Sequence, residues 1–582
     1  MPPSKCALLI VLVSVLCTVF VTNSSFPQSA VTAKHFWFAA AVCFASLFIP
    51  FSISKSNKTH LTDVLFCVLA LYVCCNYFFL NGNPDMKWWL TLLMFPLYFA
   101  IRLISGDDNL RRWLLAVILV VVLAQAVWGL LQLYGFVRSY HNLYKITGTF
   151  FNPGPYSGFV AVGVPLALCY SFDKTLSRWE RCLGIATLVS ALLVLPAAMS
   201  RAAWIAAAIG CVPVLFKYFG FSFYNLRHKL PFVIAGSLVI VAMLAGTYLL
   251  KKDSADGRWV IWSASMESVK ENPFFGSGYG RFAAVYGDAQ SAYFQKKERT
   301  AAQIMVADSP EYAFNEYVQI AVELGIVGLA LFLLTAGSSL NSSFLTFHSS
   351  FLTLHSSFLT FLVFAAFSYP FSVLPLGIMF VFLLALSAPS SKKLSFSLPV
   401  FLQIVGVAVC LCITAYGAFQ IFPKRAAYRE WASIQTLYRS TAHHHVINEY
   451  TSLYSRLYFE KNFLFEYGQC LSKTGQQAES NLIFAEYLRY GSDPMVYNCM
   501  GNNFKETGDY EKAENMYIRA SQIVPNRHYP LYLLMMMYSE IDEPDKAKAM
   551  AETLLAKPVK VQSTAIREMQ LEARKILETN TE

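Results

Sequence analysis

The stretch Ala313-Phe314-Asn315-Glu316-Tyr317 leads directly into an apolar segment that reads Gly-Ile-Val-Gly at 325–328. The residues before it, 251–312, form a hydrophilic loop rich in Arg, Lys, Tyr and Gly. A long polar loop that meets an apolar segment in this way indicates a membrane protein with one large working surface outside the bilayer. Because ionisable side chains at a bilayer boundary cost free energy, those in this stretch are candidates for function.

The composition also indicates a membrane protein. Of the 582 residues, 56% are hydrophobic and only 14% are charged. A run of about 20 apolar residues crosses the hydrocarbon core of a bilayer. Thirteen apolar segments begin near Cys6, Phe36, Leu61, Trp88, Trp113, Tyr156, Cys182, Ala202, Pro231, Asn315, Ser357, Phe371 and Pro399. We therefore expect an all-α polytopic fold with 12 or 13 transmembrane helices in residues 1–423, followed by a soluble domain in residues 424–582.

The distribution of Lys and Arg predicts the orientation. With a cytoplasmic N-terminus, the short inner loops carry most of the basic residues and the short outer loops carry few, as the positive-inside rule requires. The 251–312 loop and the C-terminal domain then lie on the outer side.

Several classes of partner are disfavoured. The net charge of +10 comes mostly from the inner loops, and no basic stripe is interleaved with aromatic residues, which argues against nucleic acid. The adjacent acidic pair Asp107-Asp108 lies on the inner side, so we expect no metal or other cofactor on the outer face. The three histidines at 443–445 are interpreted as a solvated linker. Cys470 and Cys499 are the two cysteines of the C-terminal domain, and their spacing does not indicate a disulfide framework.

Two internal repeats stand out. Residues 342–362 hold three copies of a seven-residue unit beginning Ser-Ser-Phe-Leu-Thr. The copies lack the flanking charges of a coiled coil, so we interpret them as an expansion in the connection between two spans. The second repeat begins at Pro494 and has the tetratricopeptide period, in which large and small residues alternate so that two helices pack. Its signature residues are Tyr497, Met500, Gly501, Phe504, Gly508, Tyr510, Ala513, Tyr517, Ala520 and Pro525. Looser units precede and follow it, and an amphipathic segment at 563–577 is expected to cap the array.

Four polar groups lie on the outer face in this orientation, at 148–158, at 200–204, at 256–282 and at 308–323. In the first, Gly and Pro residues form a tight turn where Asn152 can present an amide. The second reads Ser-Arg-Ala-Ala-Trp, and its Arg201 is either an interfacial anchor or an anion clamp, because a guanidinium offers a rigid fork to phosphate.

The third group contains Arg258 and Arg281 on either side of an expected amphipathic helix, followed by a Gly-rich turn whose backbone N–H groups can face an anion. The fourth contains Asp308, Glu311 and Tyr312, then a helical face shared by Asn315, Gln319 and Glu323, with Glu316 beside it. A carboxylate such as Glu323 inside an apolar span is costly unless it is paired.

Together and in this order, the four groups resemble the O-antigen ligase family, whose relatives include O-antigen polymerases and bacterial protein O-oligosaccharyltransferases. The family's loop motif is His-Asn, nine residues, then Gly-x-x-Gly. Here Asn315 is followed after nine residues by Gly325 and Gly328. The Ser-Arg-x-x-Trp and Gly-Arg-x-x-x-Trp motifs correspond to Arg201 and Arg258, and the resemblance covers about residues 110 to 390.

The resemblance implies a glycosyltransferase that moves a glycan from an undecaprenyl-pyrophosphate carrier to an acceptor, without a metal or a nucleotide sugar. It implies that Arg201 and Arg258 bind the pyrophosphate, and we add Arg281 to this set. It also implies a multi-pass protein of the bacterial inner membrane, with its active face and C-terminal domain in the periplasm. Membrane lipid, and a protein bound by the tetratricopeptide array, are further expected partners.

The chain departs from the family where Phe314 occupies the position of the histidine that is proposed to activate the acceptor hydroxyl. Either a carboxylate is the base, with Glu316 first and Asp308 or Glu311 next, or binding and orientation dominate, or the protein is inactive. Asn315 completes the candidate catalytic set, with Asn152, Tyr312 and Glu323 as supporting positions. The expected acceptor is lipid A core. A protein acceptor, a growing glycan, and a non-catalytic scaffold or lipid flippase are the alternatives.

Overall fold

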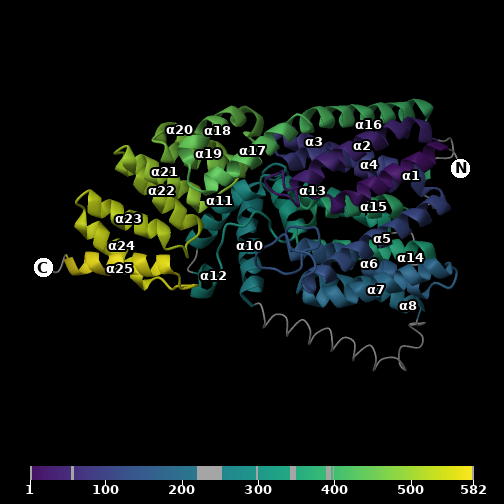
Figure 1. The fold of residues 1–582 in the computed structure, drawn as a ribbon, viewed down its shortest axis with the longest axis horizontal. Helices are drawn as coiled ribbons and strands as arrows, with labels where there is room; N and C mark the ends of the chain where they lie inside the picture. The colour runs from purple at the N-terminus through teal and green to yellow at the C-terminus, as the bar shows by residue number, and fades with distance from the viewer. Residues whose placement is uncertain are drawn as a thin grey trace, which may run out of the picture.

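The computed structural model of the chain describes residues 3–53, 58–218, 252–296, 299–340, 349–388, 395–396 and 399–579. Most of these residues are helical, and two two-residue strands, β1 (Thr59–His60) and β2 (Ser395–Phe396), pair antiparallel. Figure 1 shows a bundle of helices at one end and the C-terminal helices at the other, with α10, α11 and α12 between them. The all-α fold expected from the sequence is confirmed.

Ten helices are long and apolar enough to cross a membrane, within the part of the chain that the structure describes. They are α1 with the short helix η1 (Pro3–Leu16 and Cys17–Phe20), α2 (Thr32–Ser52), α3 (Leu61–Phe79), α4 (Met86–Ser105), α5 (Asp108–Leu133), α6 (Pro153–Phe172), α7 (Arg178–Ala197), α8 (Arg201–Tyr218), α13 (Glu316–Leu340) and α16 (Val400–Ile421). Two shorter apolar helices, α14 (Ser349–Ala365) and α15 (Leu374–Ser387), lie in the same bundle. The segment predicted to begin near Pro231 lies outside the described residues.

The helices of the bundle are buried to different degrees, and the exposed apolar faces indicate where lipid surrounds the protein. Helices α6 and α15 are buried on almost all sides. Helices α3 and α16 instead carry large exposed apolar side chains such as Leu71 and Phe401. A helix that exposes an apolar face needs a non-aqueous surrounding, so the chain is a multi-pass membrane protein.

The seven-residue repeat is a helix and not a connection, which corrects the interpretation made from the sequence. Its second and third copies form most of α14, while the first copy lies outside the described residues. Phe358 and Phe361 of these copies are fully buried in the core. The Thr360 hydroxyl donates to the Ser356 carbonyl 3.0 Å away within the same helix, and His355 Nε2 lies 3.0 Å from the Ser339 carbonyl of α13.

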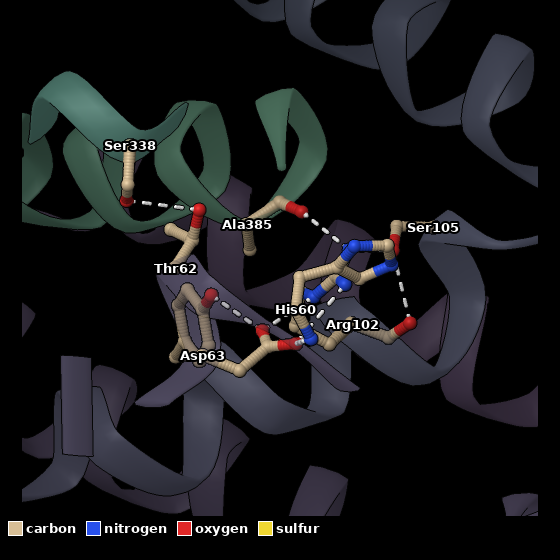
Figure 2. A network of polar contacts seen from close by, with 8 residues as sticks. His60, Thr62, Asp63, Arg102, Ser105, Ser338 and Ala385 are labelled. Carbon is tan, nitrogen blue, oxygen red and sulfur yellow. Dashed lines mark hydrogen bonds and ion pairs between the residues drawn. The ribbon is translucent and has the colours of Figure 1, made fainter. Parts of the chain in front are cut away.

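One end of α3 is tied to its neighbours by a buried ion pair (Figure 2). The Asp63 carboxylate accepts from Arg102 Nε at 2.8 Å, from the Tyr98 hydroxyl at 2.7 Å and from the His60 backbone N–H at 2.8 Å. Arg102 also donates to the Ala385 carbonyl of α15 at 3.3 Å. Asp63 is therefore neutralised and joins α3, α4 and α15 at this end of the bundle.

Breaking this pair is expected to destabilise the fold strongly. Asp63→Leu leaves the Arg102 guanidinium buried without its carboxylate, which costs about 3–5 kcal/mol. Replacing both residues, as Asp63→Leu with Arg102→Met, removes the orphaned charge and is expected to recover most of the loss. Thermal unfolding in detergent measures both variants. A single variant as stable as the double one would contradict the expectation.

The large loop and the C-terminal region are helical as well. The loop contains α10 (Lys252–Glu271), α11 (Phe282–Gln295) and α12 (Ala301–Met305). The C-terminal region begins with α17 (Lys424–Arg439), α18 (His443–Leu457) and three helix pairs. The pairs are α19 with α20 (Lys461–Lys473, Gln477–Tyr487), α21 with α22 (Pro494–Glu506, Tyr510–Ile523) and α23 with α24 (Tyr529–Glu540, Pro544–Ala556), and α25 (Thr564–Thr579) ends the array.

Small residues let the paired helices approach closely. A Cβ atom on Gly501 of α21 would lie 2.4 Å from the ring of Tyr517 on α22. In the pair before it, a Cβ on Gly468 would lie 2.6 Å from the ring of Phe484. Each glycine therefore makes room for one aromatic side chain, as the alternation of large and small residues in the sequence predicts.

Candidate active site

The connection between α14 and α15 is the centre of the polar site. It contains the short helix η3 (Pro370–Ser372). Its Phe367 carbonyl accepts from Arg258 at 3.0 Å, and its Phe371 N–H donates to Glu316 at 2.7 Å. One short connection thus contacts α10 of the loop and the first residue of α13.

Arg258, which contacts this connection, is close enough to a second arginine for their charges to interact. Arg258 comes from α10, and Arg201 is the first residue of α8. Burial, followed by the positive charge of Arg201, lowers the pKa of Arg258. A bound anion would offset the positive charge that disfavours the charged form of Arg258, so the two arginines form a candidate anion site.

Aromatic rings form the wall beside Arg258. The guanidinium lies 5.5 Å from the centroid of the Phe314 ring, within range of a cation–π contact. Tyr369 meets Phe314 edge-on at 5.3 Å and stacks on Tyr312 at 4.5 Å. Burial raises the pKa of both tyrosines, so both hydroxyls stay protonated at neutral pH.

Phe314 itself has an unusual backbone. Its φ of 52° lies in the left-handed region, which costs a bulky residue of order 1–3 kcal/mol. Such strain persists only where the surroundings fix the chain, and it clusters at functional sites. The position that departs from the family motif is thus held in a conformation that aims the ring at Arg258 and Tyr369.

A lysine and two carboxylates lie on the other side of the connection. Glu316 is only 2% exposed, and the Lys87 ammonium acts on both Glu316 and Glu323. Lys87 also reaches the hydroxyl of Ser372 in the connection, at 3.4 Å. Lys87 therefore compensates the negative charge that two buried glutamates bring to the start of α13.

Glu323 is held by the Gly-rich turn. One carboxylate oxygen accepts from the Gly280 N–H at 3.0 Å, and the other accepts from the Gln319 amide at 3.1 Å. Tyr279, next to Gly280, is buried beside Lys87, and its burial raises its pKa to about 12. The Gly280 N–H group of the turn therefore binds the carboxylate of Glu323, a side chain of the protein itself.

The Gly-rich turn also forms hydrogen bonds with backbone groups beside an interruption of α13. Gly325 has a φ of 67°, which interrupts the helix. The turn supplies the missing bonds, since Ser277 N–H donates to the Val322 carbonyl at 2.8 Å and Ile326 N–H donates to the Pro273 carbonyl at 2.9 Å. A broken helix is tolerated at a membrane boundary only where its backbone groups are satisfied in this way.

Gly325→Ala is expected to disrupt this joint. A Cβ at this position would lie 2.2 Å from the Phe274 carbonyl oxygen, and the left-handed φ adds about 1–2 kcal/mol for an L-residue. We expect a clear fall in thermal stability in detergent, together with loss of any activity that depends on Glu323. Gly337→Ala on the same helix is the matched control, because nothing lies within 4 Å of its Cβ. Equal stability of the two variants would contradict the expectation.

An apolar cavity of about 370 Å³ opens from the carboxylate side. Its polar end is formed by Lys87, Tyr279, Glu316, Gln319 and Glu323. Its walls are apolar side chains of α3, α4, α13, α15 and α16. A cavity with one polar end and apolar walls that include two lipid-facing helices fits a hydrocarbon chain better than a sugar.

Two candidate side chains turn out to be helix caps. The side-chain oxygen of Asn315 accepts from the Tyr317 and Val318 N–H groups at 3.0 and 3.3 Å and begins α13. The side-chain oxygen of Asn152 accepts from Gly154 N–H at 2.9 Å and begins α6. Both amides therefore orient a helix, and their capping role was not expected from the sequence.

The structure separates two other candidates from the arginine pair. Arg281 donates to the Leu80 carbonyl at 3.4 Å, at the turn between α3 and α4. The Asp308 carboxylate pairs at 3.1 Å with Arg527 of the C-terminal region, and its side chain is 63% exposed. Glu316 is the candidate carboxylate that lies closest to the connection.

Lys87 and Tyr369 are the site residues that sequence reasoning missed. The signal that could have found Lys87 is a lone lysine at the start of an apolar span, which must find an anionic partner.

These features define a multi-pass membrane protein whose polar site lies where a large loop meets the helix bundle. A family model described as O-antigen ligase matches residues 186–333, a stretch that includes Arg201, Arg258 and Glu316. The match supports the O-antigen ligase family and an enzymatic role in glycan transfer during synthesis of lipopolysaccharide or another glycoconjugate. A search of curated proteins found no match.

Proposed function

We propose that the chain transfers a glycan from an undecaprenyl-pyrophosphate carrier to an acceptor hydroxyl on the outer side of the bacterial inner membrane. The observation that carries the proposal is the arginine pair. Arg258 of α10 binds the Phe367 carbonyl of the connection whose Phe371 N–H binds Glu316, and the charge of Arg201, from the start of α8, acts on Arg258. A pyrophosphate is the leaving group whose charge such a pair neutralises.

In this proposal, the acceptor oxygen attacks the anomeric carbon of the glycan, and the bond from that carbon to the phosphate oxygen breaks. The proton of the acceptor hydroxyl passes to Glu316, and undecaprenyl pyrophosphate leaves with both electrons of the broken bond. Phe314 cannot accept a proton, so the base must be another group. Glu316 is buried next to the connection that binds Arg258, which makes it the strongest candidate.

We assign the apolar cavity to the lipid part of the donor. The polar end of the cavity contains the carboxylates of Glu316 and Glu323, which repel another anion. We therefore assign the pyrophosphate to the arginine side of the connection. The walls suit the isoprenoid chain of the carrier, which reaches the cavity from the lipid beside α3 and α16. The guanidinium groups then neutralise the charge that a metal ion neutralises in other transferases.

The acceptor we favour is lipid A core, which makes the protein an O-antigen ligase. Transfer to a protein hydroxyl is the second candidate, because helix pairs of the kind that bind peptides lie against the loop that enters the site. We propose that these pairs are tetratricopeptide repeats of a periplasmic domain. O-antigen polymerase activity belongs to the same class of reaction, and a non-catalytic scaffold is the alternative outside it.

A deletion strain separates the acceptors. Loss of the polysaccharide ladder on a lipopolysaccharide gel, restored by the intact gene, supports the ligase. Loss of the glycoprotein signal alone supports transfer to protein, and an unchanged gel and stain would support the scaffold.

A further inference from the structure

We infer that the C-terminal helices hold the segment 305–311 in place and so position Tyr312 and Phe314 in the site. The residues responsible are positioning residues and not catalytic ones. The inference rests on the proposed function for its activity readout. Its structural part, that the C-terminal helices restrain this segment, can be tested independently.

The first observation is a set of backbone contacts from the C-terminal region to the end of α12. The Asn526 amide nitrogen donates to the Met305 carbonyl at 3.0 Å and to the Ala307 carbonyl at 2.8 Å. One side chain thereby binds the carbonyl of the last residue of α12 and a second carbonyl two residues beyond the helix. The two hydrogen bonds together restrain the chain on both sides of Val306.

The second observation is that the contacts continue toward the site. Arg527 pairs with the Asp308 carboxylate at 3.1 Å, and the Ser309 hydroxyl donates to the Ser492 carbonyl at 3.3 Å. Lys461 pairs with Glu311 at 2.8 Å. Residues 305, 307, 308, 309 and 311 are all held by the C-terminal region, and Tyr312 follows immediately.

Helix α11 of the loop is also held by buried hydrogen bonds to the C-terminal region. Gln290 is fully buried, and its amide donates to the Ile523 carbonyl at 2.6 Å and to the Asp308 carbonyl at 2.9 Å. The Ser492 hydroxyl donates to the Ala283 carbonyl at 2.8 Å and accepts from Gly287 N–H at 3.1 Å. Buried and fully paired polar groups of this kind are unlike the loose interface between independent domains.

These contacts help to keep the strained backbone of Phe314 in place. A left-handed phenylalanine relaxes unless the chain on both sides is fixed. On one side Asn315 caps α13 inside the bundle. On the other side, the segment 305–311 is held by the C-terminal helices, which lie outside the bundle (Figure 1). The C-terminal region therefore has a structural task in the site, besides any partner that it binds.

Two substitutions in the full-length chain test this. Asn526→Asp keeps the size of the side chain but removes the N–H donor and places a carboxylate against two carbonyl oxygens. Gly287→Ala inserts a Cβ only 2.6 Å from the Ser492 Cβ, as a wedge between the loop and the C-terminal region. The matched controls are Asn502→Asp, which keeps the acceptor for the Tyr517 hydroxyl, and Gly406→Ala, which has nothing within 4 Å of its Cβ.

The readouts are hydrogen exchange of the backbone amides of 299–313 and glycan transfer in membrane vesicles with a lipid-linked glycan donor. We expect exchange to be about tenfold faster or more in both test variants, because part of the restraint on this segment is lost. We also expect kcat to fall by a similar factor with KM for the donor unchanged, because the membrane helices and α10 still place Arg201 and Arg258. A general loss of folding would also lower the apparent kcat with KM unchanged, so the rates are referred to the folded protein, and unchanged exchange outside 299–313 shows that the rest of the chain stays folded.

Three results would overturn the inference. They are unchanged exchange in both test variants, faster exchange with unaltered kcat, and equal effects in the control variants. Full transfer by both Arg201→Ala and Arg258→Ala in the same vesicles would instead disprove the proposed function. In that case the exchange data still decide whether the C-terminal helices hold 305–311.

Discussion

Arg258→Ala is expected to abolish glycan transfer while the protein still inserts and accumulates in the membrane. The guanidinium contacts the Phe367 carbonyl and the Phe314 ring, and the charge of Arg201 acts on it. Removing one group that stabilises developing negative charge typically lowers the rate about 10²–10³-fold. Transfer from a lipid-linked donor in membrane vesicles measures the effect.

Arg258→Lys is the informative companion to this variant. Lysine keeps the charge but loses the planar fork that binds two phosphate oxygens at once, so we expect only partial activity. Arg456→Ala is the matched control, because Arg456 forms a surface ion pair with Glu430 in the C-terminal region. Full activity of both Arg201→Ala and Arg258→Ala would contradict the proposed function and favour a scaffold.

Glu316→Gln is expected to have the second large effect, a loss of about 10²–10⁴-fold in rate if Glu316 is the general base. The amide oxygen of glutamine can still accept from the Phe371 N–H, so the connection between α14 and α15 should stay in place. The substitution removes the ability to take a proton, and it also removes one of the two negative charges that Lys87 compensates, while Glu323 keeps the other. Single-turnover transfer separates this chemical step from binding of the donor.

The control for Glu316→Gln is Glu430→Gln at the same surface ion pair. Thermal unfolding in detergent should show that Glu316→Gln is as stable as the parent protein. If the variant retains most of its rate, the reaction depends on binding and orientation, or on a different base, and Glu316 has a structural role through Phe371.

Much of the fold could be predicted from the sequence because its signals are local. Apolar runs of spanning length identified the membrane helices that the structure describes, since such a run is costly to leave in water wherever it lies in the chain. The glycines of the C-terminal region had the right spacing to accept Tyr517 and Phe484 from the paired helix. Arg201, Arg258 and Glu316 were recognisable from their motifs and from their positions beside apolar segments.

The roles of several candidates could not be predicted, because each role depends on a partner far away in the chain. Asn315 caps α13, although its motif suggested chemistry. Asp308 faces Arg527, more than two hundred residues later. The Gly280 N–H, which the sequence offered to an anionic substrate, binds the carboxylate of Glu323.

The sequence by itself determined that this chain is a polytopic helical protein with arginines and carboxylates where its large loop meets the bilayer. Hydrophobic length and charge decide this, and both are properties of short segments. Only the tertiary structure decided that the connection at 366–373 joins Arg258 to Glu316, that Lys87 balances two buried glutamates, and that the C-terminal helices hold 305–311. Each of these depends on hydrogen bonds and charges between segments that meet only when the whole chain has packed.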